Sequence, residues 1–518
     1  MKVFWPLTAF ALLVLSFAAV WLGELNQDEG WYIYAANLVA EGQMPYRDFF
    51  YTQAPLMPLV YSVFSGIWAK WGLLGARIFT LSIGLVSVAF LIGFARRLVS
   101  CEKRSLVALV VAIVLFGNLY HLYFLAIPKT YALASLFVSM GFFLVSFEGA
   151  LAAVASGICM AFACATRLSL GVIIPVVVMG LLVCRDSRGR SRFDWLWFGM
   201  GSALAIALVF GPFLLGPSFD GFLAAQRYHA SRAGGDIVLA VGSLSRLVRW
   251  YLPLFVLLGI GAYAALCKGD AGEGLCRERR KRLALFLAFS CCIAVVVVHI
   301  LAPVPYEDYN VPVIGLLAAC AAVLVSEWLE LKPAGIALLA LGMTWASSFG
   351  CPLLQEWMTN GRNGFWTYSR SKSGLAQLRE VARKINGLDP GGSEILTQDL
   401  YLAVESGRKV PRQMAMGPFC FWSKLPYEGA EKVLLDDVGM HALLEGTECK
   451  IAAMSGYSFA ITAPKCTETP IGQQIGYWNI LKRRYDRVFT EEDFGQHATP
   501  LMVLMRKETH EDNGGTSL

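Results

Sequence analysis

The sequence predicts an α-helical protein that crosses a membrane about eleven times and carries a small α/β domain at its C-terminal end. Three observations predict this class. Hydrophobic residues make up 56% of the chain and charged residues only 16%, whereas soluble domains carry about 25% charged residues. Apolar runs approaching the length of about 20 residues that a bilayer requires recur over residues 1–350. Over residues 351–518 these runs shorten and charges become frequent. We therefore expect a transmembrane domain followed by an exported α/β domain.

The first segment, residues 4–23, is apolar throughout and is expected to form a membrane helix. Only Lys2 stands as a charge before it, and no small-residue cleavage site follows it. We interpret it as a retained helix and not as a signal peptide. The other spans are expected at residues 76–95, 105–120, 131–147, 150–166, 168–184, 195–216, 250–267, 283–301, 310–326 and 334–350.

Basic residues indicate how these spans are oriented. Arg and Lys cluster near residues 96–104, 185–192 and 268–282, and basic loops stay on the cytoplasmic side. All three loops are cytoplasmic if the N-terminus is cytoplasmic, which makes the C-terminal domain periplasmic or extracellular. The segment 55–71 is apolar but short and contains prolines. We interpret it as an interfacial helix, because a span there would move the first basic loop to the outside.

Two adjacent carboxylates, Asp28 and Glu29, follow the first span directly. The residues after them place Trp31, Tyr34 and Leu38 at helical spacing, which predicts an amphipathic helix lying in the membrane interface and anchored by its aromatic side chains. The carboxylates would stand at its start. A helix N-terminus favours negative charge, so a purely structural alternative remains open, in which Asp28 is only the N-cap.

The C-terminal domain is expected to combine short helices and strands. Leu375 to Ile385 has a helical pattern, and Glu394 to Thr397 and Pro500 to Met505 have strand patterns. A polar tail begins at Lys507 and is expected to be disordered.

The cysteines permit disulfides only in the exported part. Cys351, Cys420, Cys449 and Cys466 lie there, in a compartment that we expect to be oxidising. Cys449 and Cys466 flank a predicted strand, which makes them the expected pair if a disulfide forms. No Cys or His pair has the spacing of zinc ligands, so no metal ligand is assigned.

The cytoplasmic side offers little room for chemistry. Its loops are short and basic, with no Gly-rich phosphate cradle after a strand and no space for a dinucleotide-binding unit. The net charge of +6 reflects these loops and does not imply nucleic acid. The reactive groups must therefore lie outside, where an activated substrate would have to arrive attached to a lipid.

Several motifs follow one another in the membrane part. They are Asp28-Glu29, Ala36-Asn-Leu-Val-Ala-Glu-Gly42, Pro45-Tyr-Arg-Asp48-Phe49, Pro55-Leu-Met-Pro-Leu59 and the turn from Pro303 to Pro312. In these motifs the chain resembles the GT-C superfamily of membrane glycosyltransferases, and within it the branch of the protein O-mannosyltransferases and the lipid A aminoarabinose transferase. The resemblance covers about residues 1–350 and implies a GT-C-like fold, with sugar transfer from a polyprenyl-phosphate carrier and inversion at the anomeric carbon.

The resemblance implies roles for particular side chains. Transfer requires a carboxylate to take the acceptor proton and cations to hold the departing phosphate. Asp28 is the candidate base, and Glu29 would orient the acceptor or a neighbouring cation. Arg167 is the main candidate for binding the donor phosphate, because its guanidinium can hold two phosphate oxygens. Lys129 and Arg227 are further phosphate candidates.

Purely structural roles for the same residues also stay open. Arg167 could be a snorkelling residue at a helix end, and Arg227, with His229 and Arg232, could belong to a solvated loop face. Glu307 and Asp308 could be accessory acids, or simply part of a capped turn.

Asp48 is an accessory candidate on the first outer loop. Many relatives carry an acidic residue where this chain has Lys129, which argues against a tightly held divalent cation. No cofactor is therefore certain, although a divalent cation remains an option.

The resulting hypothesis is an inverting glycosyltransferase in the inner (plasma) membrane of a bacterium. Its partners would be a polyprenyl-phosphate-linked sugar donor, a lipid, glycan or protein acceptor, and membrane lipids. The alternative is a non-enzymatic transporter or binding protein for lipid-linked saccharides. A transporter should show ionisable residues in mid-span and internal repeats, whereas the polar residues here gather at one face.

Overall fold

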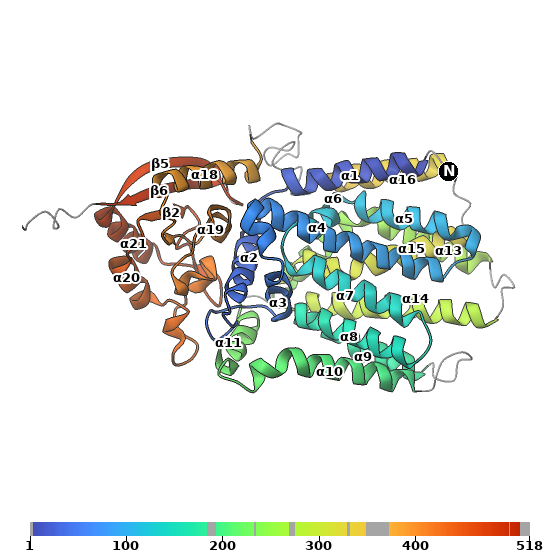
Figure 1. Cartoon of the computed structure of the whole chain (residues 1–518). Helices are drawn as coiled ribbons and strands as arrows, with labels where there is room; N and C mark the ends of the chain where they lie inside the picture. Colours follow the sequence, from blue (N-terminus) through green and yellow to red (C-terminus); the bar gives the residue numbers. More distant parts are fainter. Residues whose placement is uncertain are drawn as a thin grey trace, which may run out of the picture.

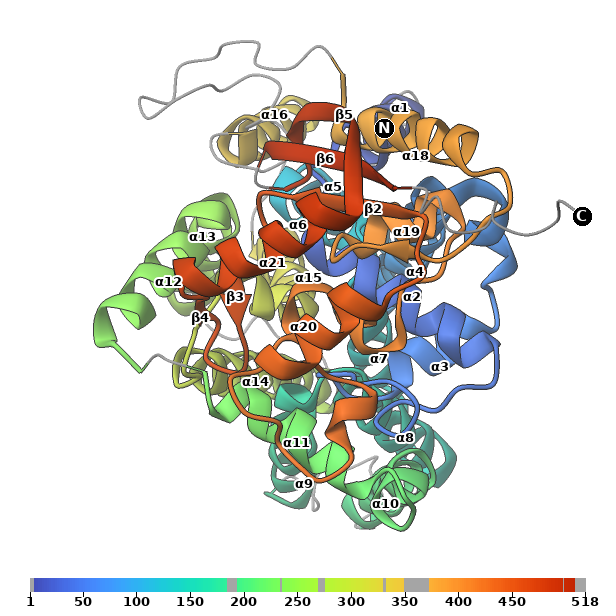
Figure 2. The same cartoon turned by 90° about the vertical axis from the view of Figure 1, so that its left-hand side faces the viewer.

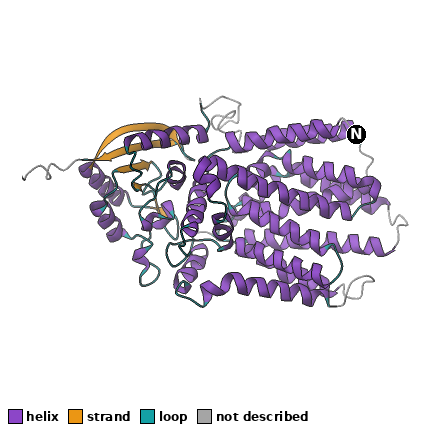
Figure 3. Ribbon diagram, in the orientation of Figure 1, coloured by secondary structure: helices purple, strands orange, loops and turns teal. Residues whose placement is uncertain are grey.

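The computed structural model describes residues 4–183, 193–232, 235–268, 275–328, 332–348, 372–496 and 498–507. Long helices run side by side in a bundle, and the C-terminal domain sits at one end of it (Figure 1). Between the two lie α2 (Gln27–Ala40), α3 (Leu56–Ser62) and α11 (Phe219–Ala230). Among the described residues, strands occur only in the C-terminal domain (Figure 3). The expected class, a helical membrane protein with a small α/β domain, is confirmed.

The bundle helices coincide with the expected spans. They are α1 (Phe4–Leu22), α4 (Gly66–Arg97), α5 (Arg104–Phe116), α7 (Thr130–Val145), α8 (Ala150–Thr166), α9 (Ile173–Val183), α10 (Asp194–Leu214), α13 (Leu252–Lys268), α14 (Leu275–Ile300), α15 (Val311–Trp328) and α16 (Pro333–Ser348).

Four segments of the described residues are long and apolar enough to cross a membrane alone, and up to seven if each bent helix pair is one span. The positions of the helices therefore agree with the sequence, whereas the number of crossings stays a prediction.

The outer surface of the bundle is apolar. On α1, Leu7, Phe10, Leu13 and Phe17 are each about two-thirds exposed, and exposed apolar surface of this extent marks contact with lipid or another protein. The inner surface relies on small residues. A Cβ on Gly157 of α8 would lie 2.1 Å from the Phe198 carbonyl oxygen of α10, so the two backbones approach closely, as is usual between membrane helices.

The helix after the first span, α2 (Gln27–Ala40), does not expose its aromatic side chains, so the expected amphipathic helix anchored by aromatic residues is wrong. Its side chains are buried on all sides, including Trp31, Ile33 and Ala36. The C-terminal helix α19 (Leu400–Ser406) covers it so closely that a Cβ on Gly30 would lie 2.1 Å from the Tyr401 backbone nitrogen.

The segment 55–71 is also not a single interfacial helix. It consists of the short helix α3 (Leu56–Ser62) and the first residues of α4. Within α4 the backbone leaves the helical conformation at Gly72, where φ is 62° and ψ is −151°. The main part of α4 therefore starts beside the C-terminal domain.

The C-terminal domain contains a four-stranded sheet in the order β1-β2-β6-β5. β1 pairs in parallel with β2, while β6 runs antiparallel to β2 and β5, with Ile451 opposite Met505 and Tyr485 opposite Arg506. The strands are β1 (Ile395–Leu396), β2 (Ile451–Ser455), β5 (Tyr485–Phe494) and β6 (Thr499–Arg506), and β3 (Ile461–Thr462) and β4 (Thr467–Glu468) form a separate hairpin.

The helices of this domain are α18 (Gly374–Leu388), α19, α20 (Asp437–Gly446) and α21 (Ile471–Arg484). Ser373 caps α18 by accepting a hydrogen bond from the Ala376 backbone, and Leu375, Leu378 and Ile385 turn its apolar face inward. The domain covers the ends of several bundle helices when viewed along the bundle (Figure 2). The helix and the two strands expected there are confirmed.

The expected disulfide between Cys449 and Cys466 is wrong, because both thiols are free. Cys449 is buried just before β2, whereas Cys466 lies in the β3–β4 hairpin and its sulfur is 3.1 Å from the Tyr228 hydroxyl. Nearness in sequence therefore did not bring them together. Cys351, the domain boundary near residue 350 and the polar tail beyond Lys507 lie outside the described residues.

Candidate active site

A cavity of about 970 Å³ lies between the bundle and the C-terminal domain. Its walls come from the first turn of α2, the residues before α7, the end of α8, α11 (Phe219–Ala230) and the turn before α15, while the hairpin side of the C-terminal domain closes it. Five of the eight sequence-predicted site residues line it. They are Asp28, Lys129, Arg167, Glu307 and Asp308.

Asp28 occupies the first turn of α2 but is not the N-cap, so the structural alternative for it is wrong. Asn26 caps the helix, because its side chain accepts a hydrogen bond from the Asp28 backbone at 3.1 Å. The Asp28 carboxylate accepts one hydrogen bond from the Trp31 indole at 3.1 Å and forms an ion pair with Lys129 at 2.9 Å. Its side chain retains 29% exposure, toward the cavity.

The environment keeps Asp28 ionised. Burial would raise the pKa of its carboxyl, but the charge and hydrogen bond of Lys129 outweigh burial, with help from Trp31 and Arg232, and the pKa lies below its usual value. Burial would lower the pKa of Lys129, but Asp28 and Asp308 raise it above the usual value. Both groups are therefore charged at neutral pH.

Lys129 connects two carboxylates in this cavity. Its ammonium lies 2.9 Å from Asp28 and 3.7 Å from Asp308. The Tyr131 hydroxyl donates a hydrogen bond to Asp308 at 2.8 Å, which fixes the second carboxylate. Lys129 thus places a positive charge between Asp28 and Asp308. No group of three His, Cys, Asp or Glu side chains within the described ranges could share a metal ion.

Arg167 lies at the C-terminal end of α8, where the helix stops, and is nine-tenths buried. Its guanidinium stacks over the Tyr309 ring at 4.1 Å and lies 5.2 Å from the Tyr131 ring. One terminal nitrogen donates a long hydrogen bond of 3.4 Å to Thr130, and Nε has no hydrogen-bond partner among the described residues. Rings therefore hold Arg167 in place while leaving it donors for a ligand.

Further cavity residues come from α11, the residues that follow it and the turn η3 (Glu307–Asn310). Arg232 extends to Cys466 at 3.7 Å. Glu307 pairs with Arg246 at 2.9 Å. His229 donates to the Thr52 carbonyl at 2.8 Å, and burial lowers its pKa to about 4, so it is neutral.

Three predicted site residues do not reach this cavity. Glu29 is fully buried and pairs with Arg77, so it cannot contact an acceptor, and the cation beside it is that arginine. Arg227 is exposed on the outer side of α11. Asp48 pairs with Arg47 and Arg412 beside a separate cavity of about 350 Å³.

Sequence reasoning missed Tyr131, Tyr309 and Arg77. Two of them had a signal in the sequence, since an arginine in an apolar membrane helix indicates a specific partner, and Tyr131 follows Lys129 closely. The tyrosine at 309 could be recognised only once Arg167 had been placed against it.

The bundle with a C-terminal domain at one end has the fold of a solved membrane protein. The chain resembles ArnT, an aminoarabinose transferase from Cupriavidus metallidurans, in the apo state, with a TM-score of 0.62 and 15% identity over 96% of this chain and 97% of that chain. The structure of the same protein bound to undecaprenyl phosphate gives a TM-score of 0.60 and 14% identity with the same coverage. At these identities the likeness is one of fold.

No protein-family model matches the chain, and no curated protein sequence matches it. The expected resemblance to the GT-C superfamily is therefore supported by the likeness of fold to ArnT and not by sequence. The chain is an integral membrane protein of this fold.

Proposed function

We propose that this protein is an inverting glycosyltransferase that moves a sugar from a polyprenyl-phosphate carrier to an acceptor hydroxyl. One observation carries the proposal: a single cavity holds the partly exposed carboxylate of Asp28 together with Lys129 and Arg167. A carboxylate beside several cations suits the transfer of a group from a phosphate to an oxygen nucleophile, because one accepts a proton while the others receive negative charge.

The cations form the phosphate side of the proposed site. Arg167 offers an Nε donor that has no partner among the described residues, on a guanidinium held flat against Tyr309. Such a planar group can hold two phosphate oxygens at once. Lys129 and Arg232 add positive charge on the same cavity wall. The fold neighbour ArnT has been solved with undecaprenyl phosphate, which supports a lipid phosphate as the ligand for these cations.

The carboxylate forms the acceptor side. In the proposed reaction the acceptor oxygen attacks the anomeric carbon, and its proton passes to Asp28. The bond between that carbon and the phosphate oxygen breaks, and the polyprenyl phosphate leaves with the electron pair. One displacement inverts the anomeric carbon. The leaving group is a phosphate, so no second carboxyl is needed to protonate it, unlike in a glycosidase.

The proposed location follows from the charge pattern. With the N-terminus in the cytoplasm, the cavity and the C-terminal domain face the outside of a bacterial inner membrane. Nucleotide sugars are absent there. A lipid-linked sugar can reach the cavity from the bilayer, and the acceptor can be a lipid, a glycan or a protein.

The experiment has two stages. Mass spectrometry of envelope lipids and glycans would identify which molecule loses a sugar when the gene is deleted. The purified full-length protein is then given the matching polyprenyl-phosphate sugar or the nucleotide sugar in detergent. We expect transfer from the first and none from the second. Transfer from the nucleotide sugar without a lipid intermediate would contradict the proposal, and lipid binding without any transfer would support the transporter alternative.

A further inference from the structure

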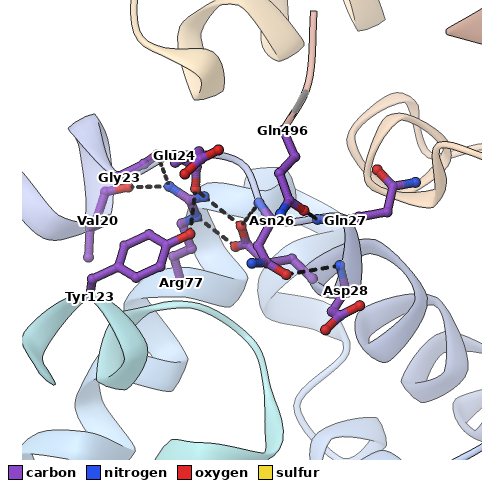
Figure 4. Close-up of polar contacts among 10 residues, drawn as sticks. Val20, Gly23, Glu24, Asn26, Gln27, Asp28, Arg77, Tyr123 and Gln496 are labelled. Atoms are coloured by element: carbon purple, nitrogen blue, oxygen red, sulfur yellow. Dashed lines mark hydrogen bonds and ion pairs between the residues drawn. The ribbon is translucent and has the colours of Figure 1, made fainter. Parts of the chain in front are cut away.

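Arg77 is the most heavily bonded side chain near the cavity, although it does not line it. It lies in α4 with no exposed surface. Its guanidinium donates two hydrogen bonds to Glu29, at 2.7 and 2.6 Å, and three to backbone carbonyls, Val20 at 3.0 Å, Gly23 at 2.9 Å and Glu24 at 2.7 Å. All five N–H donors of the arginine are therefore used (Figure 4).

The three carbonyls belong to the corner between α1 and α2. The chain turns by 85° there, and the last carbonyls of a helix have no partner within it. Arg77 supplies those partners, and the Tyr123 hydroxyl donates one more hydrogen bond to the Glu24 carbonyl at 3.1 Å. The direction in which α2 leaves the corner is thus fixed by a side chain of α4.

The bond to Glu29 extends this arrangement to the cavity. Glu29 also accepts a hydrogen bond from the Asn26 backbone at 2.9 Å, and the Asn26 side chain accepts one from the Asp28 backbone at 3.1 Å. This is a capping box, which sets the first turn of a helix. On the other side of Asp28, the Gln27 backbone donates to Gln496 of the C-terminal domain at 2.7 Å. Asp28 therefore stands between two fixed neighbours, Gln27 and Glu29, and its side chain faces the cavity.

We infer that Arg77 is a positioning residue that sets where the Asp28 carboxylate points, acting through Glu29 and the α1–α2 corner. The inference rests on the proposed function, since it assigns Asp28 a task that requires exact placement. A displacement of about 1 Å at a reacting group can cost about a hundredfold in rate. Stability alone accounts poorly for this pair, because a buried ion pair can often be replaced by uncharged residues without loss of stability.

The test uses the double variant Arg77→Met with Glu29→Gln. Removing both charges leaves no unpaired buried charge, and glutamine can still close a capping box, so we expect the full-length protein to fold. Binding of undecaprenyl phosphate should change by less than about threefold, because Lys129 and Arg167 are untouched. The turnover number should fall about 10- to 100-fold, and the backbone amides of residues 26–31 should exchange hydrogen faster.

Two further variants complete the design. Arg77→Lys keeps the charge but has fewer donors in a different geometry, so its turnover should lie between the double variant and wild type. The matched control is Asp389→Asn with Arg408→Met, which removes another buried ion pair, of 2.7 Å, inside the C-terminal domain. The control should keep the wild-type turnover and the wild-type exchange at residues 26–31.

Wild-type turnover together with unchanged exchange in the Arg77 double variant would overturn the inference, as would an equal loss of turnover in the control. If the double variant is not recovered, Arg77→Lys decides the question by its ratio of turnover to lipid binding. A wild-type protein that transfers no sugar would contradict the proposed function, but the exchange measurement would still test the arrangement around Arg77.

Discussion

Asp28 and Lys129 show how two side chains define each other's state. The ammonium keeps the carboxylate ionised, and the carboxylate keeps the ammonium charged, although both are largely withdrawn from solvent. A proton acceptor and a cation therefore stand side by side in one cavity. Replacement of either one leaves the other without its partner, which makes conservative substitutions the informative ones.

The first prediction concerns Asp28→Asn. Asn26 is the helix cap, so the variant should fold, insert and bind undecaprenyl phosphate much as wild type does. An amide cannot take the acceptor proton, and loss of a general base costs about 10² to 10⁴ in rate. We expect sugar transfer to fall by at least about a hundredfold. Retention of more than a tenth of the activity would exclude Asp28 as the base.

The second prediction concerns Arg167. Arg167→Ala should weaken the binding of undecaprenyl phosphate by at least about tenfold, since a hydrogen bond to a charged group contributes about 1.5–3 kcal/mol. Arg167→Lys should lose less, because lysine keeps the charge but not the planar pair of donors. Arg227→Ala is the control, because that exposed arginine lies outside the cavity. Equal binding by all three variants would remove Arg167 from the phosphate site.

The third prediction is a pH dependence of stability. Burial is the main reason why the pKa of His229 falls from the usual 6.5 to about 4 in the folded protein. Between pH 4 and 6.5 the unfolded protein therefore binds more protons than the folded one. Stability must then rise with pH across this window and fall as the pH drops toward 4. His229→Gln should flatten this dependence. Thermal unfolding in detergent from pH 4.5 to 7.5 measures it, and identical slopes would contradict the prediction.

At the scale of elements, the break in α4 joins the bundle to the C-terminal domain. Gly72 adopts a conformation with φ 62° and ψ −151° that is essentially restricted to glycine. The next backbone nitrogen, that of Leu73, donates to the Glu405 carboxylate of α19 at 2.7 Å, and a Cβ on Gly72 would lie 2.1 Å from that carboxylate. Helix α4 therefore restarts with its cap supplied by another domain.

The fourth prediction follows from this geometry. Gly72→Ala should destabilise the protein by about 1–3 kcal/mol, because the strained backbone conformation disfavours any side chain. Gly66→Ala is the matched control, since Gly66 begins the same helix and a Cβ there meets no atom within 4 Å. Thermal unfolding of both variants in detergent gives the comparison. An equal melting temperature for the two would show that the break tolerates a side chain.

The periodicity of apolar residues predicted where the helices lie better than it predicted which of their faces are buried. The apolar face of α2 was visible in the sequence, but the second buried face was not, because its cover comes from α19, far along the chain. Helical phase explains the error at α11. Tyr228 is buried on the inner face, whereas Arg227 is rotated by one residue and exposed. Because the residue at which α11 begins was not known, the sequence could not predict which basic residue faces the cavity.

At the scale of the whole molecule, the predicted site residues that line the cavity lie close together because all of them belong to the same end of the helix bundle. Asp28, Lys129 and Asp308 are far apart in sequence but close in space, as the order of the predicted spans required. Glu29 and Asp48 were misassigned because their partners, Arg77 and Arg412, lie on elements whose contacts are long-range. The predicted spans indicate at which end of the bundle a residue lies, but not which side chains it contacts there.

The fifth prediction tests the orientation of the molecule. Reporters that are active only in the cytoplasm should work near residues 100, 188 and 275. Reporters that need export should work near residues 45, 235 and 400. An exported signal near residue 100 would contradict the proposed orientation and would place the cavity on the cytoplasmic side.

The cover that α19 and its neighbours place on α2 also imposes an order on synthesis. Gln27 donates a hydrogen bond to the Gln398 carbonyl, 371 residues later in the chain. A ribosome needs roughly 20 to 75 s to translate that interval at about 5–20 residues per second. During this time the aromatic surface of α2 has left the translocon without its cover. The part of the cavity wall that is synthesised first therefore stays uncovered until the last quarter of the protein arrives.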